Sequence, residues 1–187
     1  HIYYFLNIYM CKTTVLFRYL TFSPGRAIIR TVPTKTEVDG NGYEISGVYI
    51  NDTSKNYQGL FGCADSGSIK NIGVEKSLIQ GDEYVGGVCG RTWGTITNCY
   101  YNSTVYSGNV SGWGDQGTAS YGLPTEQMQA AAGSTLSTGV ANNKPLVDLL
   151  NGYTDGTGAY PADFLKWANA AGAYPMFLPP HTHSFSY

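Results

Sequence analysis

The sequence is poor in charge and has no long uninterrupted apolar run. Asp, Glu, Lys and Arg make up only 13% of its 187 residues, about half the usual share for a soluble domain. The formal net charge is −2, so no excess of basic residues can replace the counterions of a nucleic acid, and we expect no nucleic-acid partner. Lys12 and Arg18 interrupt the aromatic stretch of residues 1–31, which argues against a membrane span in this chain.

Several catalytic and metal-binding motifs are missing. The cysteines form no C-x-x-C pair, and the zinc-peptidase motif H-E-x-x-H is absent. The Gly-rich run Tyr84–Gly90 lacks the lysine and the following helix of a phosphate-binding loop. His181 and His183 form an H-x-H pair without a third metal ligand nearby in the sequence. We therefore expect no catalytic residue, no cofactor and no metal site.

Glycine and tyrosine are abundant, with 24 and 16 residues, and Ser, Thr and Asn are frequent. This composition is typical of extracellular all-β proteins. The segment Asp39–Gly42 (D-G-N-G) predicts a tight turn, because Asn-Gly supplies positive φ angles. A calcium loop built from Asp39, Asn41 and Glu44 is the alternative, but the spacing does not fit the twelve-residue calcium-binding loop.

Residues 57–101 repeat themselves. Gly59-Leu60-Phe61-Gly62 returns as Gly87-Val88-Cys89-Gly90. The pair Ile69/Ile72 returns as the pair Ile96/Cys99, at nearly the same spacing along the chain. The pair Ile45/Val48 aligns with them as an earlier copy. A repeat on this length scale is typical of stacked structural units, because one copy cannot bury its own apolar face. The sequence therefore predicts a mainly β fold, a short β-solenoid of about three rungs.

The four cysteines are Cys11, Cys63, Cys89 and Cys99. The repeat alignment places Cys89 where Phe61 stands and Cys99 where Ile72 stands. We interpret both as small buried apolar residues, with a disulfide framework as the open alternative.

Changes of pattern along the chain divide it into four parts. Residues 1–32 are an unassigned segment, either a cap, a tail or foreign sequence. The first residue, His1, indicates a fragment or a processed or engineered product. Residues 33–111 form the predicted solenoid, and residues 180–187 form a tail or linker. Residues 112–179 are a loop and short helices that close the open end of the solenoid. Their expected elements are helices over 124–132 and 145–151, a helical turn over 164–168 and a strand over 174–178.

The order of these motifs resembles the GLUG-motif repeat family. The resemblance rests on Gly59–Gly62, on the run from Gly67 to Val74, on Asp39–Gly47, on Tyr84–Gly90 and on Ile96–Tyr101. Members of that family are repeats in large secreted or wall-attached bacterial proteins, common in gut bacteria, and in non-catalytic regions of IgA-cleaving metallopeptidases. The resemblance implies a β-solenoid, extracellular display and a role as stalk or adhesion module. It implies no catalytic residues.

The function that we expect is a non-catalytic surface module, acting as a stalk, a spacer or an adhesion domain that faces glycans or proteins. Exposed rings are candidates for stacking on sugars, although rings also pack well without a ligand. These candidates are Tyr57, Tyr84, Trp93 and Trp113.

An enzyme on a β-helix, acting on a polysaccharide, is the alternative, as is an accessory region of an IgA-type metallopeptidase. The acidic candidates are the neighbours Asp82 and Glu83, and Asp65, which is expected near Arg91 on the next rung. An ion pair on the surface is the simpler interpretation of Asp65 and Arg91. Open solenoid ends also leave homotypic assembly open.

Overall fold

The computed structural model describes residues 29–32, 37–104, 106, 108–137, 141–153, 159, 166–170 and 172–177. The chain is mainly β, with 41% of residues in strands and 11% in helices, and this confirms the predicted fold class at that level. Predictions for Cys11, Phe164, Leu165, His181 and His183, and for the tail 180–187, lie outside the described residues.

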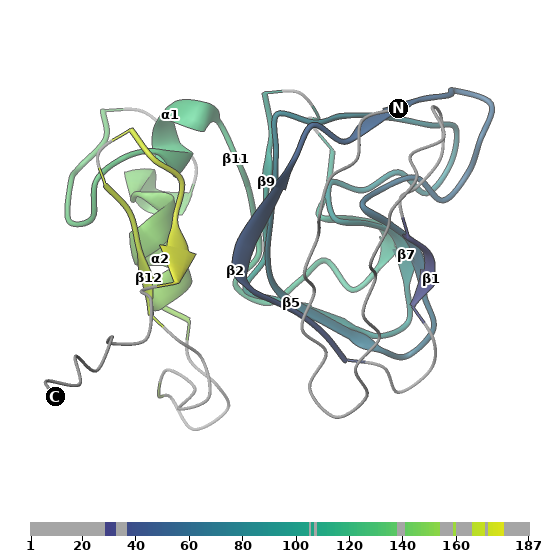
Figure 1. Ribbon diagram of the computed structural model, residues 1–187, viewed down its shortest axis with the longest axis horizontal. Helices are drawn as coiled ribbons and strands as arrows, with labels where there is room; N and C mark the ends of the chain where they lie inside the picture. Colours follow the sequence, from purple (N-terminus) through teal and green to yellow (C-terminus); the bar gives the residue numbers. More distant parts are fainter. Residues whose placement is uncertain are drawn as a thin grey trace, which may run out of the picture.

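Three parallel sheets make up the β body (Figure 1). Within the described residues, the chain passes through all three in turn twice and then returns to the first and second sheets only. The first sheet contains β1 (Ile29–Val32), β4 (Phe61–Ala64), β7 (Cys89–Thr92) and β10 (Ser111–Gly114), in that order. The second contains β2 (Glu37–Ser46), β5 (Ser68–Glu75), β9 (Tyr100–Asn102) and β11 (Tyr121–Leu123), with β8 (Thr95–Thr97) also beside β5. The third pairs β3 (Tyr49–Asn51) with β6 (Leu78–Gln80).

Equivalent positions of the second and third copies lie side by side, as the repeat predicts. Phe61 pairs with Cys89 between β4 and β7, and Ile69 pairs with Ile96 between β5 and β8. The parallel sheets extend further than expected at both ends. The segment Ile29–Val32, assigned above to a separate N-terminal part, is β1, and β10 and β11 continue the sheets beyond residue 111. The parallel sheets therefore continue past the predicted boundaries at residues 33 and 111, and the first sheet has four strands while the third has two.

The alignment of the first copy is also wrong. Val38, not Ile45, pairs with Ile69, and Ile45 pairs with Val74. The cause is a bulge in β2, where Asp39 pairs with Lys70 but Tyr43 pairs with Ile72, so β2 holds two more residues than β5 between these pairs. The predicted turn at Asp39–Gly42 is this bulge, and it lies inside a strand.

The core of the body is a row of apolar side chains contributed by successive copies. Leu60, Phe61, Val88 and Cys89 of the two Gly-flanked motifs are all fully buried. Cys89 and Cys99 carry free thiols with no exposed surface, as interpreted from the repeat. Burial raises the pKa of both thiols to about 12, which keeps them protonated and unreactive at neutral pH.

A ladder of polar side chains runs across the second sheet. The Asn98 amide donates to the Asn71 side-chain oxygen at 3.0 Å, and the Asn71 amide donates to an Asp39 carboxylate oxygen at 3.0 Å. Asn71 and Asn98 both have a left-handed backbone, with φ of 56° and 55°. Asn tolerates this region better than most residues, so one residue type meets both the backbone and the ladder requirement.

The ladder of side-chain hydrogen bonds ends at Asn98 and does not continue into the copy that contains Thr118 and Ala119. Thr97 pairs with Thr118, which places Ala119 beside Asn98, and Ala119 keeps the left-handed backbone at φ 47°. Alanine has no amide to continue the ladder. The buried side-chain oxygen of Asn98 is accordingly without a hydrogen-bond partner within the described part of the chain.

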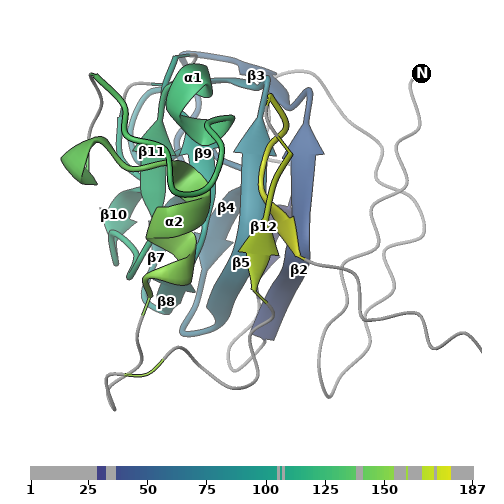
Figure 2. The same ribbon diagram turned by 90° about the vertical axis from the view of Figure 1, so that its left-hand side faces the viewer.

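The C-terminal unit consists of α1 (Thr125–Met128), α2 (Leu146–Asn151), a short 3-10 turn and the antiparallel pair β12 (Trp167–Ala168) and β13 (Met176–Phe177). It covers the outer face of the second sheet (Figures 1 and 2), not an open end as predicted. The buried Tyr100 of β9 lies in its core together with Leu146, Leu150 and Trp167. Trp167 and Ala168 were expected to be helical, and this is wrong because they pair with β13. The second helix and its end at Gly152 are confirmed, whereas the first helix stops at Met128.

We expect Ala119→Asn to stabilise the fold by about 0.5–1 kcal/mol. The new amide would donate to the Asn98 oxygen, and Asn accepts the left-handed backbone more readily than Ala. Chemical denaturation of the variant and the parent measures the difference. Asn71→Ala, which removes a middle member of the ladder, is the opposite control and should destabilise by about 1–3 kcal/mol. An unchanged midpoint for Ala119→Asn would contradict this account of the ladder.

Candidate aromatic site

Four exposed or half-exposed rings gather around one cation on the first sheet. They are the four rings selected from the sequence: Tyr57, Tyr84, Trp93 and Trp113. The Arg91 guanidinium lies 3.6 Å from the Trp93 ring centroid and 4.9 Å from that of Trp113. It lies 5.9 Å and 5.8 Å from the centroids of Tyr57 and Tyr84. We call these five residues the aromatic patch.

The strand register places the centre of the patch. Arg91 of β7 pairs with Cys63 of β4 on one side and with Trp113 of β10 on the other. Trp93 follows β7 directly, and its backbone N–H donates to the Ala64 carbonyl at 3.0 Å. The two tryptophan rings meet edge to face, with centroids 5.5 Å apart. Both rings stay open to solvent, with Trp93 51% and Trp113 44% exposed.

The tyrosines come from equivalent turns that precede β4 and β7. Their rings are nearly parallel, 5.0 Å apart with an interplanar angle of 10°. Both residues have a left-handed backbone, Tyr57 at φ 61° and Tyr84 at φ 57°. The Tyr57 N–H donates to the Glu83 carbonyl at 3.0 Å, so the two turns are joined by a backbone hydrogen bond. The repeat therefore stacks one tyrosine on the next.

Glycines of the repeat let these turns lie against the neighbouring strand. A Cβ on Gly90 would lie 2.6 Å from the Tyr57 carbonyl carbon, and a Cβ on Gly112 would lie 2.4 Å from that of Tyr84. Any side chain at these positions would push the tyrosine turns outward. Gly90 is one of the motif glycines identified in the sequence, and the structure gives it a role in placing the patch.

The acidic candidates from the sequence do not form a catalytic arrangement. Asp65 does not pair with Arg91, because the guanidinium stacks on Trp93 while the Asp65 carboxylate accepts a long contact of 3.6 Å from the Cys63 thiol. Asp82 and Glu83 are exposed in the turn before Tyr84 and are not on a strand. Glu83 accepts a hydrogen bond from Asn56 at 3.4 Å.

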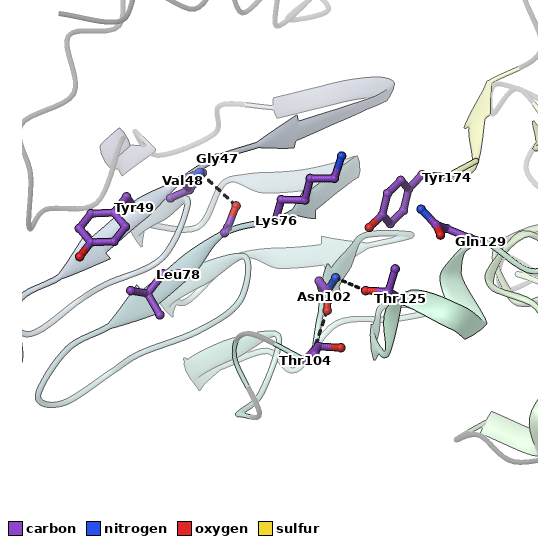
Figure 3. A pocket seen from close by; sticks show the side chains of 11 residues that line it. Gly47, Val48, Tyr49, Lys76, Leu78, Asn102, Thr104, Thr125, Gln129 and Tyr174 are labelled. Atoms are coloured by element: carbon purple, nitrogen blue, oxygen red, sulfur yellow. Dashed lines mark hydrogen bonds between the residues drawn. The ribbon is translucent and has the colours of Figure 1, made fainter. Parts of the chain in front are cut away.

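A second candidate, which the sequence did not indicate, is an open groove of about 630 Å³ between the β body and the C-terminal unit (Figure 3). Lys76, Asn102, Thr125 and Tyr174 contribute polar groups to it. The Asn102 amide donates to the Thr125 hydroxyl at 2.8 Å, and its oxygen accepts from the Thr104 N–H at 2.9 Å. Because internal hydrogen bonds use the Asn102 amide and the Thr125 hydroxyl, we rank the groove below the aromatic patch as a ligand site.

A buried carboxyl group, Glu75, also lies at this junction, next to the exposed carboxyl group of Glu44. Glu75 at the end of β5 is only 1% exposed, and it faces Glu44 and the Tyr100 hydroxyl. Burial, followed by hydrogen bonding and repulsion from the Glu44 carboxylate, raises the pKa of Glu75 to about 10. Lys76 opposes the shift, and Tyr174 is the remaining titratable neighbour. At neutral pH Glu75 is therefore a protonated hydrogen-bond donor.

Comparison with known proteins gives only partial matches. No family model matches the chain, and no solved structure does. A protein described as a Gly-rich membrane protein from Evansella cellulosilytica is 37% identical over 65 residues, which are 33% of this chain and 8% of that protein. Halomucin from Haloquadratum walsbyi is 33% identical over 69 residues, 35% of this chain and 1% of halomucin. The chain thus matches a small part of each relative.

The described helices are too short to cross a bilayer. The longest, α2, has six residues, and none of the helices in the described ranges combines the length and the apolar character of a membrane span.

We expect the stability of the fold to fall as pH rises between the ordinary carboxyl pKa of 4.5 and about 10. Across this window folded Glu75 keeps a proton that the unfolded chain releases, so stability is complete below the window and decreases through it. Glu75→Gln keeps the shape and the donor but cannot ionise. It should therefore reduce the pH dependence of the free energy of unfolding by up to about 1.4 kcal/mol per pH unit.

Chemical denaturation of parent and variant between pH 5 and pH 9 measures this slope. Glu126→Gln, a change at an exposed residue of α1, is the matched control and should leave the slope unchanged. Parallel profiles for the parent and Glu75→Gln would contradict the assignment.

Proposed function

We propose that the chain is a non-catalytic module of a secreted or surface-displayed protein, and that its aromatic patch contacts carbohydrate. The convergence of four rings from three successive copies on one solvent-facing side carries this proposal. Aromatic faces offer rigid apolar area that costs little conformational entropy on binding, and the C–H face of a sugar ring stacks on such area.

The architecture supports the same role. We interpret the rotation of the chain through three parallel sheets as a short β-solenoid, in which each copy covers the next. Such a scaffold can extend as a stalk by adding copies, and it can present equivalent side chains in rows. The resemblance to GLUG-motif repeats, which occur in secreted or wall-attached proteins, favours extracellular display. The partial relatives include one described as a membrane protein, which is compatible with display at a surface.

Removal of the two tryptophans tests the proposal. In affinity gel electrophoresis against a panel of polysaccharides, we expect at least one polymer to retard the parent chain. Trp93→Ala combined with Trp113→Ala should weaken that retention by about tenfold or more, because two exposed stacking surfaces are lost.

Tyr49→Ala is the matched control, because Tyr49 is 58% exposed but lies on β3 in the third sheet. It should leave retention unchanged. Tryptophan fluorescence gives a second readout, since two of the three tryptophans are in the patch and Trp167 is buried. If no polymer retards the parent chain, the module is a spacer and the carbohydrate role is wrong.

A further inference from the structure

The cation at the centre of the aromatic patch has no acidic partner among the described residues. The ion pairs that side chains form in this part of the chain are those of Lys70 with Glu37 at 3.0 Å and with Asp39 at 3.5 Å. Arg91 takes part in neither. The nearest candidate, Asp65, contacts the Cys63 thiol instead. The guanidinium charge is therefore balanced by ring faces and solvent.

The way Arg91 is held leaves its donors available. The guanidinium lies over the Trp93 ring at 3.6 Å, a contact that uses the flat face of the group. The N–H donors of a guanidinium lie in its plane and point away from a ring stacked on its face. No described acceptor takes a hydrogen bond from them. The Nε atom is buried, so the donors that a ligand can reach are those of the two terminal nitrogens. Half-buried N–H groups without a hydrogen-bond partner favour the binding of a ligand that supplies an acceptor.

The geometry also places Arg91 in the path of a ligand. One guanidinium lies within 6 Å of all four ring centroids, between the stacked tyrosines and the tryptophan pair. A chain of sugar units that touches a ring of each pair must pass next to Arg91. A cationic ligand would be repelled there. A carboxylate, in contrast, matches the fork of N–H donors in a bidentate contact.

We propose that the aromatic patch selects carboxylate-bearing glycans, such as polymers of uronic acids, through Arg91. This inference rests on the proposed carbohydrate role, and it divides the patch into two tasks. The four rings supply contact area to the sugar faces, and Arg91 supplies the preference for acid.

A matched pair of polymers tests the preference. Polygalacturonic acid and its fully methyl-esterified form share one backbone and differ in charge. We expect the parent chain to bind the acid form about tenfold or more tightly, as befits one charge-assisted bidentate contact. Added salt should weaken binding of the acid form more than binding of the ester. Dextran sulfate, a polyanion without carboxylates, should compete poorly.

Two substitutions of Arg91 separate charge from shape. Arg91→Gln should lose the preference for the acid form while it keeps binding to the ester. Arg91→Lys should keep part of the preference, since a point charge remains but the planar fork is lost. Thermal unfolding of both variants checks that the sheet is intact, and Arg91→Lys keeps the test meaningful if Arg91→Gln unfolds.

The outcomes distinguish the two proposals. Equal binding of acid and ester by the parent chain, or an unchanged preference in Arg91→Gln, overturns the acid selectivity and leaves the carbohydrate role standing. Equal competition by dextran sulfate or by double-stranded DNA also overturns it, because binding would then follow charge alone. If neither polymer binds and the double tryptophan variant behaves as the parent on the whole panel, the carbohydrate role itself is wrong.

Discussion

Parallel pairing between successive copies is the constraint on which the rest of the structure depends. Because equivalent residues meet side by side, a residue type that two successive copies share lies next to its own counterpart. Asn71 then stacks on Asn98, and Tyr57 stacks on Tyr84. The same pairing makes glycine indispensable where a turn of one copy lies against a strand of the next, as at Gly90. One rule of register thus produces both a buried polar ladder and an exposed row of rings.

The same constraint explains what could be predicted from the sequence. The spacing of the two Gly-flanked motifs sets the pairing of Phe61 with Cys89, and the burial of both follows from their apolar or thiol side chains. The alignment failed where spacing alone misleads. Because β2 contains a bulge of two extra residues, the partner of Ile69 is Val38 and not the predicted Ile45. A run of glycine and asparagine is compatible with both a bulge and a turn, so the sequence does not distinguish them.

The candidate site was predictable as a set of residues but not as an arrangement. Exposed Tyr and Trp residues stood out because a chain with so little charge offers few other surface groups. Their convergence depends on two further facts: the left-handed turns at Tyr57 and Tyr84, and the pairing of Arg91 with Trp113. Neither is visible in the repeat, since the copy containing Trp113 follows at a shorter spacing and lacks the Gly-flanked motif.

The position of the C-terminal unit was missed for a similar reason. Its apolar residues indicate a partner, and only the structure shows that Tyr100 provides it.

The left-handed backbone at Tyr57 and Tyr84 has an energetic cost that can be compared with what their rings gain from packing. A left-handed conformation costs a bulky residue about 1–2 kcal/mol relative to glycine, and here two such residues hold it at equivalent positions. Stacking between the rings recovers about 0.5–1.5 kcal/mol, so the pair offsets roughly one of the two penalties. Glycine at both positions would meet the same backbone requirement without this cost. The buried part of each ring and the nearby Arg91 guanidinium add to this stacking, so packing within the repeat holds the two tyrosines in their left-handed turns, and the surface that stays open is available to a partner.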